Sequence, residues 1–257
     1  MSAEPLLRIR DVVVRFGGIV ALDHVTFDVE RGEICGLIGP NGAGKTTLFN
    51  CLSRLYTPDS GDIMLSATRL TDVPRYAVAK LGIGRTFQNL ALFRTMSVRR
   101  NITVGAHCRT RSGFMSDTLR MPSVRAEERA LARKVDGLIE LLGLGSVADL
   151  SVDELPFGTK KRVELARALA SEPTLLLLDE PAGGLNHDEV EMLRTLILSI
   201  RDRLALTVLL VEHHMGLVMR VSDRVVALDF GRKIAEGKPA EVQSNPDVIR
   251  AYLGTAA

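Results

Sequence analysis

Aromatic residues are scarce in this 257-residue chain, which contains no tryptophan, three tyrosines and eight phenylalanines. The scarcity matters in the basic stretch 85–134, where ten arginines and Lys134 outnumber three carboxylates by eight charges. Its aromatics are Phe87, Phe93 and Phe114, too few for the stacking series that binds single-stranded nucleic acid. We therefore expect no nucleic-acid partner. Two interpretations of the basic stretch stay open: a solvated helical face, or a surface that faces an anionic membrane leaflet or an acidic partner protein.

Long hydrophobic runs are also lacking. The longest, around 175–178 and 206–211, have the length of strands, whereas a spanning helix needs about 20 apolar residues. Glu4 and Arg8 interrupt the N-terminus, so we expect no cleavable signal sequence. Neither a membrane-spanning nor an exported protein is predicted.

Cysteine is sparse and odd in number, with Cys35, Cys51 and Cys108 at spacings that fit no metal site. Cys35 and Cys51 fall in apolar stretches, which favours core thiols in a reducing compartment. A cytoplasmic location is therefore expected.

The most informative segment that is present runs from Gly39 to Thr46 and follows the pattern G-x-x-x-x-G-K-[ST]. The apolar run 34–38 before it predicts a buried strand, and 47–52 after it predicts a helix. A strand, a glycine loop and a helix N-terminus direct backbone N–H groups and a positive helix end at phosphates. Lys45 would reach the β- and γ-phosphates, and the Thr46 hydroxyl would hold Mg²⁺. The segment predicts a nucleoside triphosphate site.

A second informative segment is the leucine run 175–178, which ends in Asp179 and Glu180. The run has no polar face, so the strand must be buried, and ligands of open α/β sheets lie at the carboxyl ends of strands. Asp179 is predicted to hold Mg²⁺ or its waters. Glu180 is predicted to polarise the attacking water as a general base. Taken alone, the pair could simply be surface carboxylates that end a strand.

Gln88 and a histidine pair are further candidates. Gln88 lies at the junction between the strand-rich core and the helical segment that follows it. A glutamine there can contact a metal or water. His213 and His214 follow the predicted strand 207–211. A histidine can hydrogen-bond a γ-phosphate and the catalytic water, but the residues themselves do not choose between the two.

The alternation of strands and helices predicts an α/β fold. Strands at 175–178, 207–211 and 225–228, with an amphipathic helix at 188–203, favour a mainly parallel, doubly wound sheet covered by helices. The first thirty residues alternate as in a small antiparallel sheet. Residues 95–150 lose strand character, and the spacing over 126–142 is helical.

In order and spacing these motifs resemble the ATP-binding subunits of ABC transporters over essentially the whole chain. The marks include Phe16 before the first turn and the segment Leu155-Pro156-Phe157-Gly158-Thr159 in the place of the family's signature. The resemblance implies a P-loop NTPase (RecA-like) core at 1–88 and 160–257. It also implies a small antiparallel β subdomain and an α-helical subdomain inserted at 89–159.

The resemblance further implies a role for each site residue. Phe16 would stack on adenine, and Glu180, His213 and Gln88 would handle the catalytic water. His213 is preferred to His214 because the family's switch histidine directly follows the acidic residue at the strand end. Mg²⁺ would be held by Thr46, Gln88 and Asp179. The ATP phosphates would be held by Gly39, Pro40, Asn41, Gly42, Ala43, Gly44, Lys45, Thr46 and Thr47, and from a second subunit by Gly158 and Thr159.

A narrower resemblance points to the branched-chain amino acid uptake branch. It rests on the segments 85–90, 92–93, 211–215 and 245–254 and on the long basic stretch 107–125. It implies partners in the form of a second ATPase subunit, identical or not, transmembrane permease subunits and, indirectly, an external solute-binding protein. The chain would then sit on the inner face of the membrane. Two alternatives stay open: an ATPase of lipopolysaccharide export, and a non-transport ABC ATPase acting on DNA or ribosomes.

The signature departs from the family's usual Leu-Ser-Gly-Gly-Gln. Pro156 replaces the serine and brings neither a hydroxyl nor a backbone N–H. Lys160, Lys161 and Arg162 follow near a helix N-terminus, where cations oppose the helix dipole. The departure puts the hydrolysis rate in doubt more than nucleotide binding.

Overall fold

The computed structural model describes residues 4–88, 90–109 and 122–253. The chain divides into two compact units, one formed by 1–78 with 174–257 and the other by 79–173. The predicted insert 89–159 lies within the second unit, and its exact boundaries stay a prediction. Part of the basic stretch, 110–121, lies outside the described residues.

The first unit is built on a mainly parallel sheet, in which its strands have the order β10-β9-β3-β8-β7. Strand β3 pairs in parallel with β8 and β9, β7 pairs in parallel with β8, and β10 is antiparallel to β9. Strands β3, β7 and β8 are buried along their whole length, which is why they appear as continuous apolar runs. The bounds are Ile34–Ile38 (β3), Leu175–Asp179 (β7), Thr207–Val211 (β8), Arg224–Asp229 (β9) and Arg232–Gly237 (β10). The predicted α/β fold with a mainly parallel sheet is confirmed.

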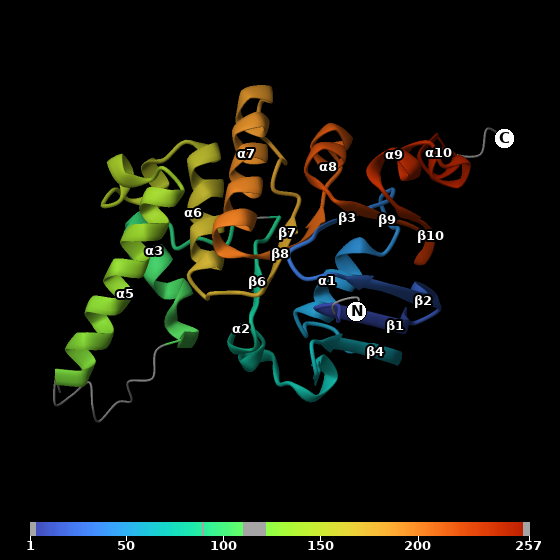
Figure 1. Ribbon diagram of the computed structural model, residues 1–257, viewed down its shortest axis with the longest axis horizontal. Coiled ribbons are helices and arrows are strands. Elements are labelled where there is room, and N and C mark those ends of the chain that lie inside the picture. The colour runs from blue at the N-terminus through green and yellow to red at the C-terminus, as the bar shows by residue number, and fades with distance from the viewer. Residues whose placement is uncertain (1–3, 89, 110–121, 254–257) are drawn as a thin grey trace. The chain divides into compact units, whose positions relative to one another are not determined.

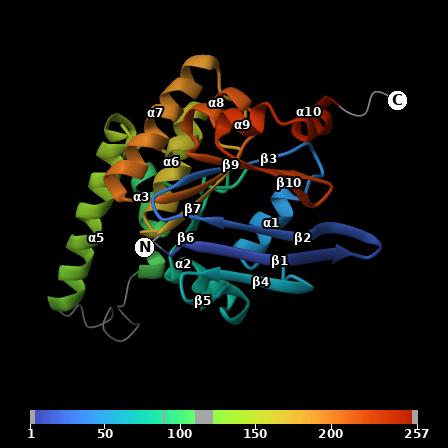
Figure 2. The same ribbon diagram turned by 45° about the vertical axis from the view of Figure 1, so that its right-hand side comes forward.

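The same unit contains the predicted antiparallel sheet, with the order β2-β1-β4-β5. Its strands are Leu7–Phe16 (β1), Ile19–Val29 (β2), Ser60–Leu65 (β4) and Thr68–Arg69 (β5). Figure 2 shows β1, β2 and β4 side by side. Strand β1 is continuous, and its register is irregular against both β2 and β4.

Helices of the first unit lie on both sides of the parallel sheet: Figures 1 and 2 show α1 on one side of β3 and β9 and α8 and α9 on the other. The predicted helix 188–203 is confirmed as α7. Its first turn is closed by a capping box between Asn186 and Glu189, which satisfies two otherwise unpaired N–H groups. The bounds are Lys45–Leu52 (α1), His187–Leu204 (α7), Met215–Val221 (α8), Pro239–Gln243 (α9) and Pro246–Leu253 (α10), with 3₁₀ turns at Leu70–Asp72 and Arg75–Ala77.

Cys35 on β3 and Cys51 on α1 are buried free thiols, as predicted, and burial raises the pKa of both. The short α2 (Val78–Leu81) begins at the boundary between the units. Within the described ranges, no helix combines the length and apolar character needed to cross a bilayer.

The second unit is mainly helical. Its α3, α5 and α6 lie side by side in Figure 1. The helix predicted at 126–142 is confirmed as α5. Asn101 on α3 is fully buried, and its amide holds the backbone carbonyls of Phe93, Met96 and Ser97. The bounds are Ile83–Arg85 (β6), Val98–Gly105 (α3), Pro122–Leu141 (α5) and Phe157–Leu169 (α6), with 3₁₀ turns at His107–Arg109, Gly145–Val147 and Val152–Glu154.

Several cations of the basic stretch have partners inside this unit. Arg99 forms ion pairs with Asp136 and Asp149, and Lys134 pairs with Glu172. Arg109 donates to backbone carbonyls of three other residues. The local charge excess is therefore offset in part by acidic residues outside the stretch, which the count over 85–134 did not include.

Candidate active site

The glycines at both ends of the phosphate loop, residues 39–46, occupy positions that exclude side chains. Gly39 directly follows β3 with φ +151°, and a Cβ there would run into the carbonyl oxygen of Leu228. Gly44 has φ +100° and stands directly before α1, where a Cβ would lie 2.6 Å from the Ala21 carbonyl oxygen. Both positions need the left-handed backbone region and close approach that glycine permits. The loop therefore has the backbone that a phosphate cradle requires.

Lys45 is the first residue of α1 and is only 5% exposed. Its Nζ donates to the carbonyl oxygens of Gly39, at 2.7 Å, and Pro40, at 2.9 Å. Burial lowers the pKa of the ammonium, and Glu180 and Asp179 oppose that shift. The ammonium thus lies inside the loop and donates to two neutral carbonyl oxygens. Bound phosphate oxygens would take their place and, being charged, would accept stronger hydrogen bonds.

Glu180 follows β7 in the left-handed region, with φ +48°. This conformation is uncommon for a residue with a side chain and marks local strain. Its backbone N–H donates to the carbonyl of Val211, and its carboxylate Oε1 lies 2.8 Å from Nε2 of His213. The adjacent strand ends of β7 and β8 therefore bring the predicted base and the predicted switch histidine together.

The two histidines differ in their contacts, which distinguish their roles. His214 uses its Nδ1 to accept the N–H of Leu217, at 3.2 Å, and so caps α8. His213 instead contacts Glu180 and lines the cavity above the phosphate loop. The structure therefore places His213, and not His214, beside the predicted general base.

Glu212 is a site residue that sequence reasoning missed. It is 2% exposed, and its carboxylate accepts the N–H groups of Ala182, His213 and His214. One buried carboxylate thereby ties the loop after Glu180 to the loop that holds His213. A carboxylate directly after an apolar strand was the available signal, but its contact with the Ala182 N–H joins residues 30 positions apart, which the sequence does not reveal.

A cavity of about 280 Å³ lies over the loop. Among the described residues its apolar lining comes from Ile19, Val20, Ala21 and Phe230, and its polar lining from loop residues 41–47, Glu180 and His213. Phe230 is 83% exposed at the turn between β9 and β10. The sequence did not mark Phe230 as a site residue, because an isolated aromatic residue before a glycine matches no binding motif.

Phe16, the predicted adenine contact, packs edge-to-face on Tyr56 with ring centroids 5.1 Å apart. It is nearly half exposed. Tyr56 therefore supports the ring of Phe16 while leaving it accessible from solvent.

The predicted Mg²⁺ ligands of this unit are hard oxygen donors. Thr46 is exposed to the cavity. Asp179 is buried at the end of β7, where its charge opposes the lowering of the Lys45 pKa that burial causes. No group of three or more His, Cys, Asp or Glu side chains in the described ranges is arranged to hold a metal. A hydroxyl and one carboxylate fit Mg²⁺, which keeps waters and takes phosphate oxygens as its remaining ligands.

Gln88, Gly158 and Thr159 belong to the second unit, and their contacts with nucleotide stay predictions. The segment of Gln88 is bound to the signature helix α6 by Glu164, whose Oε1 accepts the N–H groups of Phe87 and Ala91. Burial raises the pKa of Glu164, and those two N–H groups oppose the shift. The segment around Gln88 and the helix that begins in the signature segment are therefore tied together within one unit.

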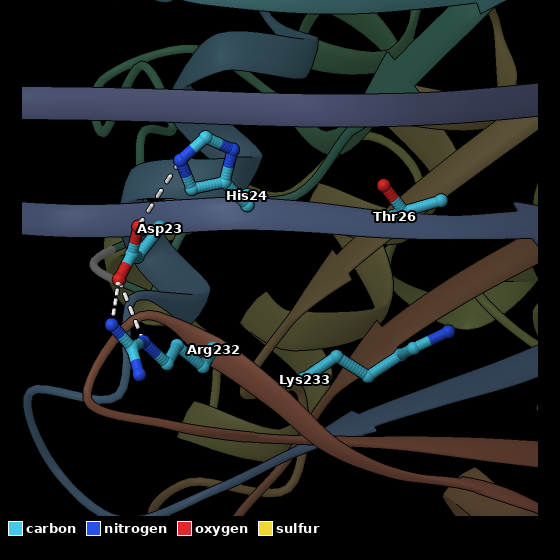
Figure 3. Close-up of a pocket in the computed structure, with 5 residues that line it drawn as sticks. All are labelled: Asp23, His24, Thr26, Arg232 and Lys233. Atoms are coloured by element: carbon cyan, nitrogen blue, oxygen red, sulfur yellow. Dashed lines mark hydrogen bonds and ion pairs between the residues drawn. The ribbon is translucent and has the colours of Figure 1, made fainter.

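A second cavity, of about 340 Å³, lies beside β2 and β10 and is shown in Figure 3. Arg232 and His24 both point at the Asp23 carboxylate, and Lys233 pairs with Glu236. Because its cations already have carboxylate partners, we assign this cavity no ligand.

Comparison with known proteins places this geometry in a family. Residues 22–183 match the ABC transporter family, and residues 232–257 match the branched-chain amino acid ATP-binding cassette transporter family. The chain belongs to the ABC transporter family. It is a transport-coupled ATP hydrolase.

Relatives match it end to end. The high-affinity branched-chain amino acid transport ATP-binding protein LivG of Salmonella typhimurium is 43% identical over 255 residues, covering 99% of this chain and 100% of the relative. BraF of Pseudomonas aeruginosa, with the same description, is 39% identical and covers 99% and 100%. The crystal structure of the ADP conformation of MJ1267, an ATP-binding cassette of an ABC transporter, is 29% identical with a TM-score of 0.85 over 98% of this chain and 100% of that one.

Proposed function

We propose that this ATPase powers the import of branched-chain amino acids through partner permease subunits. The observation that supports the proposal is full-length similarity to LivG and BraF, together with the C-terminal match at 232–257. The C-terminal match matters because it lies outside residues 22–183, the range that matches the general ABC transporter family. No observation favours lipopolysaccharide export or a role on DNA or ribosomes.

In the proposed mechanism the phosphate loop binds ATP through its backbone N–H groups. Lys45 exchanges the carbonyls of Gly39 and Pro40 for β- and γ-phosphate oxygens. Thr46 and Asp179 would hold Mg²⁺, with Gln88 as a further predicted ligand, and the ion would supply positive charge to the phosphates. Phe16, supported by Tyr56, stacks on adenine.

Glu180 accepts a proton from the attacking water, whose oxygen bonds to the γ-phosphorus as the bond to ADP breaks. His213 holds the Glu180 carboxylate through Nε2 at 2.8 Å and contacts the γ-phosphate. Glu212 accepts N–H groups from the loop after Glu180 and from the loop that holds His213. It therefore keeps the positions of the base and the histidine fixed relative to each other.

The working unit is a pair of ATPase subunits, identical or not, on the cytoplasmic face of the membrane. Gly158 and Thr159, in the first turn of α6, contact the nucleotide of the partner subunit. Pro156 stands at the N-cap of α6 with no side-chain cap hydrogen bond. The backbone N–H groups of the first turn therefore remain as phosphate donors. An external solute-binding protein delivers the amino acid to the permease.

The proposal is tested by leucine uptake into proteoliposomes that contain the chain with its permease subunits and solute-binding protein. We expect ATP-dependent uptake of leucine, isoleucine or valine, and none with the Glu180→Gln variant. ATP hydrolysis stimulated by another solute, without uptake of any of these three, would overturn amino-acid import and leave the ATPase assignment standing.

A further inference from the structure

A long-range hydrogen bond joins the C-terminal helix to the phosphate loop. The backbone N–H of Gly39 donates to the hydroxyl oxygen of Tyr252, on α10, at 2.8 Å. Burial raises the pKa of the Tyr252 phenol, and the Gly39 N–H opposes that shift. The hydroxyl therefore stays neutral at physiological pH and remains a hydrogen-bonding group at the start of the loop.

The peptide groups around Gly39 are held from several directions. The Tyr252 hydroxyl accepts the Gly39 N–H, and the Lys45 ammonium donates to the Gly39 carbonyl oxygen. The Leu228 carbonyl oxygen occupies the space that a Cβ on Gly39 would need. Of these contacts, the one from Lys45 is lost when the ammonium moves to a phosphate. The contact from Tyr252 does not depend on Lys45 and can persist with nucleotide bound.

The helix that carries Tyr252 is itself anchored. Val248 of α10 is buried in the same apolar cluster as Ile38, the last residue of β3. Asn245 accepts the N–H of Asp247 at 2.8 Å and so caps the first turn. Strand β3 and α10 therefore share a core, and the Tyr252 hydroxyl is presented to Gly39 from a fixed position.

We propose that Tyr252 is a positioning residue of the nucleotide site, through which α10 keeps the phosphate loop in its binding conformation. Without the hydroxyl, the Gly39 N–H loses its partner and the empty loop relaxes toward other conformations. Apparent affinity then falls in proportion to the fraction of chains that keep a competent loop. The inference rests on nucleotide binding by this loop and not on the identity of the transported solute.

The test compares two substitutions that each remove one hydroxyl from the full chain. Tyr252→Phe removes the contact with Gly39 and keeps the ring. Tyr76→Phe is the matched control, because Tyr76 is 83% exposed in the same unit. We expect Tyr252→Phe to weaken ATP and ADP binding about five-fold, the effect of losing one ordinary hydrogen bond. Turnover at saturating ATP should stay within about two-fold, and Tyr76→Phe should match the wild type.

Hydrogen exchange of the segment 36–46 separates positioning from general stability. In Tyr252→Phe we expect faster exchange there without nucleotide, and wild-type exchange at saturating ADP. Unchanged nucleotide affinity in Tyr252→Phe overturns the inference. So does faster exchange spread equally over β7 and β8, because that result describes a loss of overall stability.

Lys45→Ala distinguishes a failure of this inference from a failure of the site. If Lys45→Ala loses nucleotide binding while Tyr252→Phe behaves as wild type, only the role of Tyr252 is wrong. If Lys45→Ala also binds as wild type, the assignment of the loop is wrong, and with it the inference.

Discussion

Nε2 of His213 lies 2.8 Å from Oε1 of Glu180, where β8 and β7 end side by side. The contact joins residues 33 positions apart in the chain. It gives the Glu180 carboxylate a fixed partner at the wall of the cavity, with the phosphate loop lining the same space. Hydrolysis should therefore depend on both side chains while nucleotide binding depends mainly on the loop.

Glu180→Gln keeps the shape of the side chain and removes the base. We expect turnover to fall about 10²-fold or more, the usual scale for a lost general base, with ATP affinity near that of the wild type. Nucleotide binding and phosphate release measured on the same preparation check this. Undiminished phosphate release would show that another group activates the water.

His213→Ala and His214→Ala form a matched pair. His213→Ala should lower turnover about 10²-fold, because it removes the partner of Glu180. His214→Ala removes the cap of α8, so it should cost about 1 kcal/mol of stability and leave turnover within about two-fold. Thermal melts and steady-state hydrolysis decide the assignment, and the reverse pattern would exchange the roles of the two histidines.

Glu164 should give the stability of the chain a specific pH dependence. Burial raises its pKa above the ordinary value of 4.5, so the folded state binds the proton more tightly than the unfolded state does. This contribution to stability is fully present below about pH 4.5 and is lost as pH rises through the raised pKa. In that window it amounts to at most about 1.4 kcal/mol per pH unit.

Glu164→Gln keeps an acceptor for the N–H groups of Phe87 and Ala91 but cannot titrate. We expect this variant to lack that part of the slope when denaturant unfolding is followed from pH 4.5 to 8. Equal slopes in the variant and the wild type would assign the pH dependence to other groups.

The basic second unit should contact the permease subunits, and its arginines differ in what they test. Arg94 and Arg100 are exposed, so Arg94→Glu or Arg100→Glu should reduce co-purification with the permease and transport. Basal ATP hydrolysis should stay near that of the wild type. If both reversals support full transport, the docking surface lies elsewhere.

Arg99→Glu is the contrasting variant. Arg99 pairs with Asp136 and Asp149, so its reversal breaks exposed ion pairs worth up to about 1 kcal/mol each and adds repulsion. It should lower the melting temperature, unlike the other two reversals. A loss of transport in this variant would therefore reflect folding as well as docking.

The sequence by itself determined the parts of this protein that are local in the chain. The phosphate loop is contiguous with the strand before it and the helix after it, so Gly39, Gly44 and Lys45 could be placed from their pattern. The four leucines before Asp179 have no polar face and required a buried strand. The parallel sheet followed from the order of such runs, whereas the edge strand β10, which is rich in charged side chains, gave no strand signal.

Only the tertiary structure decided the contacts between distant segments. The roles of His213 and His214 differ because β7 lies beside β8, which sets Glu180 next to one imidazole while the other caps α8. Glu212 gathers N–H groups from two loops, and Tyr252 reaches Gly39 across 213 positions of the chain. Residue type and spacing cannot specify these pairings, because a hydrogen bond depends on distances that packing sets after the chain has folded.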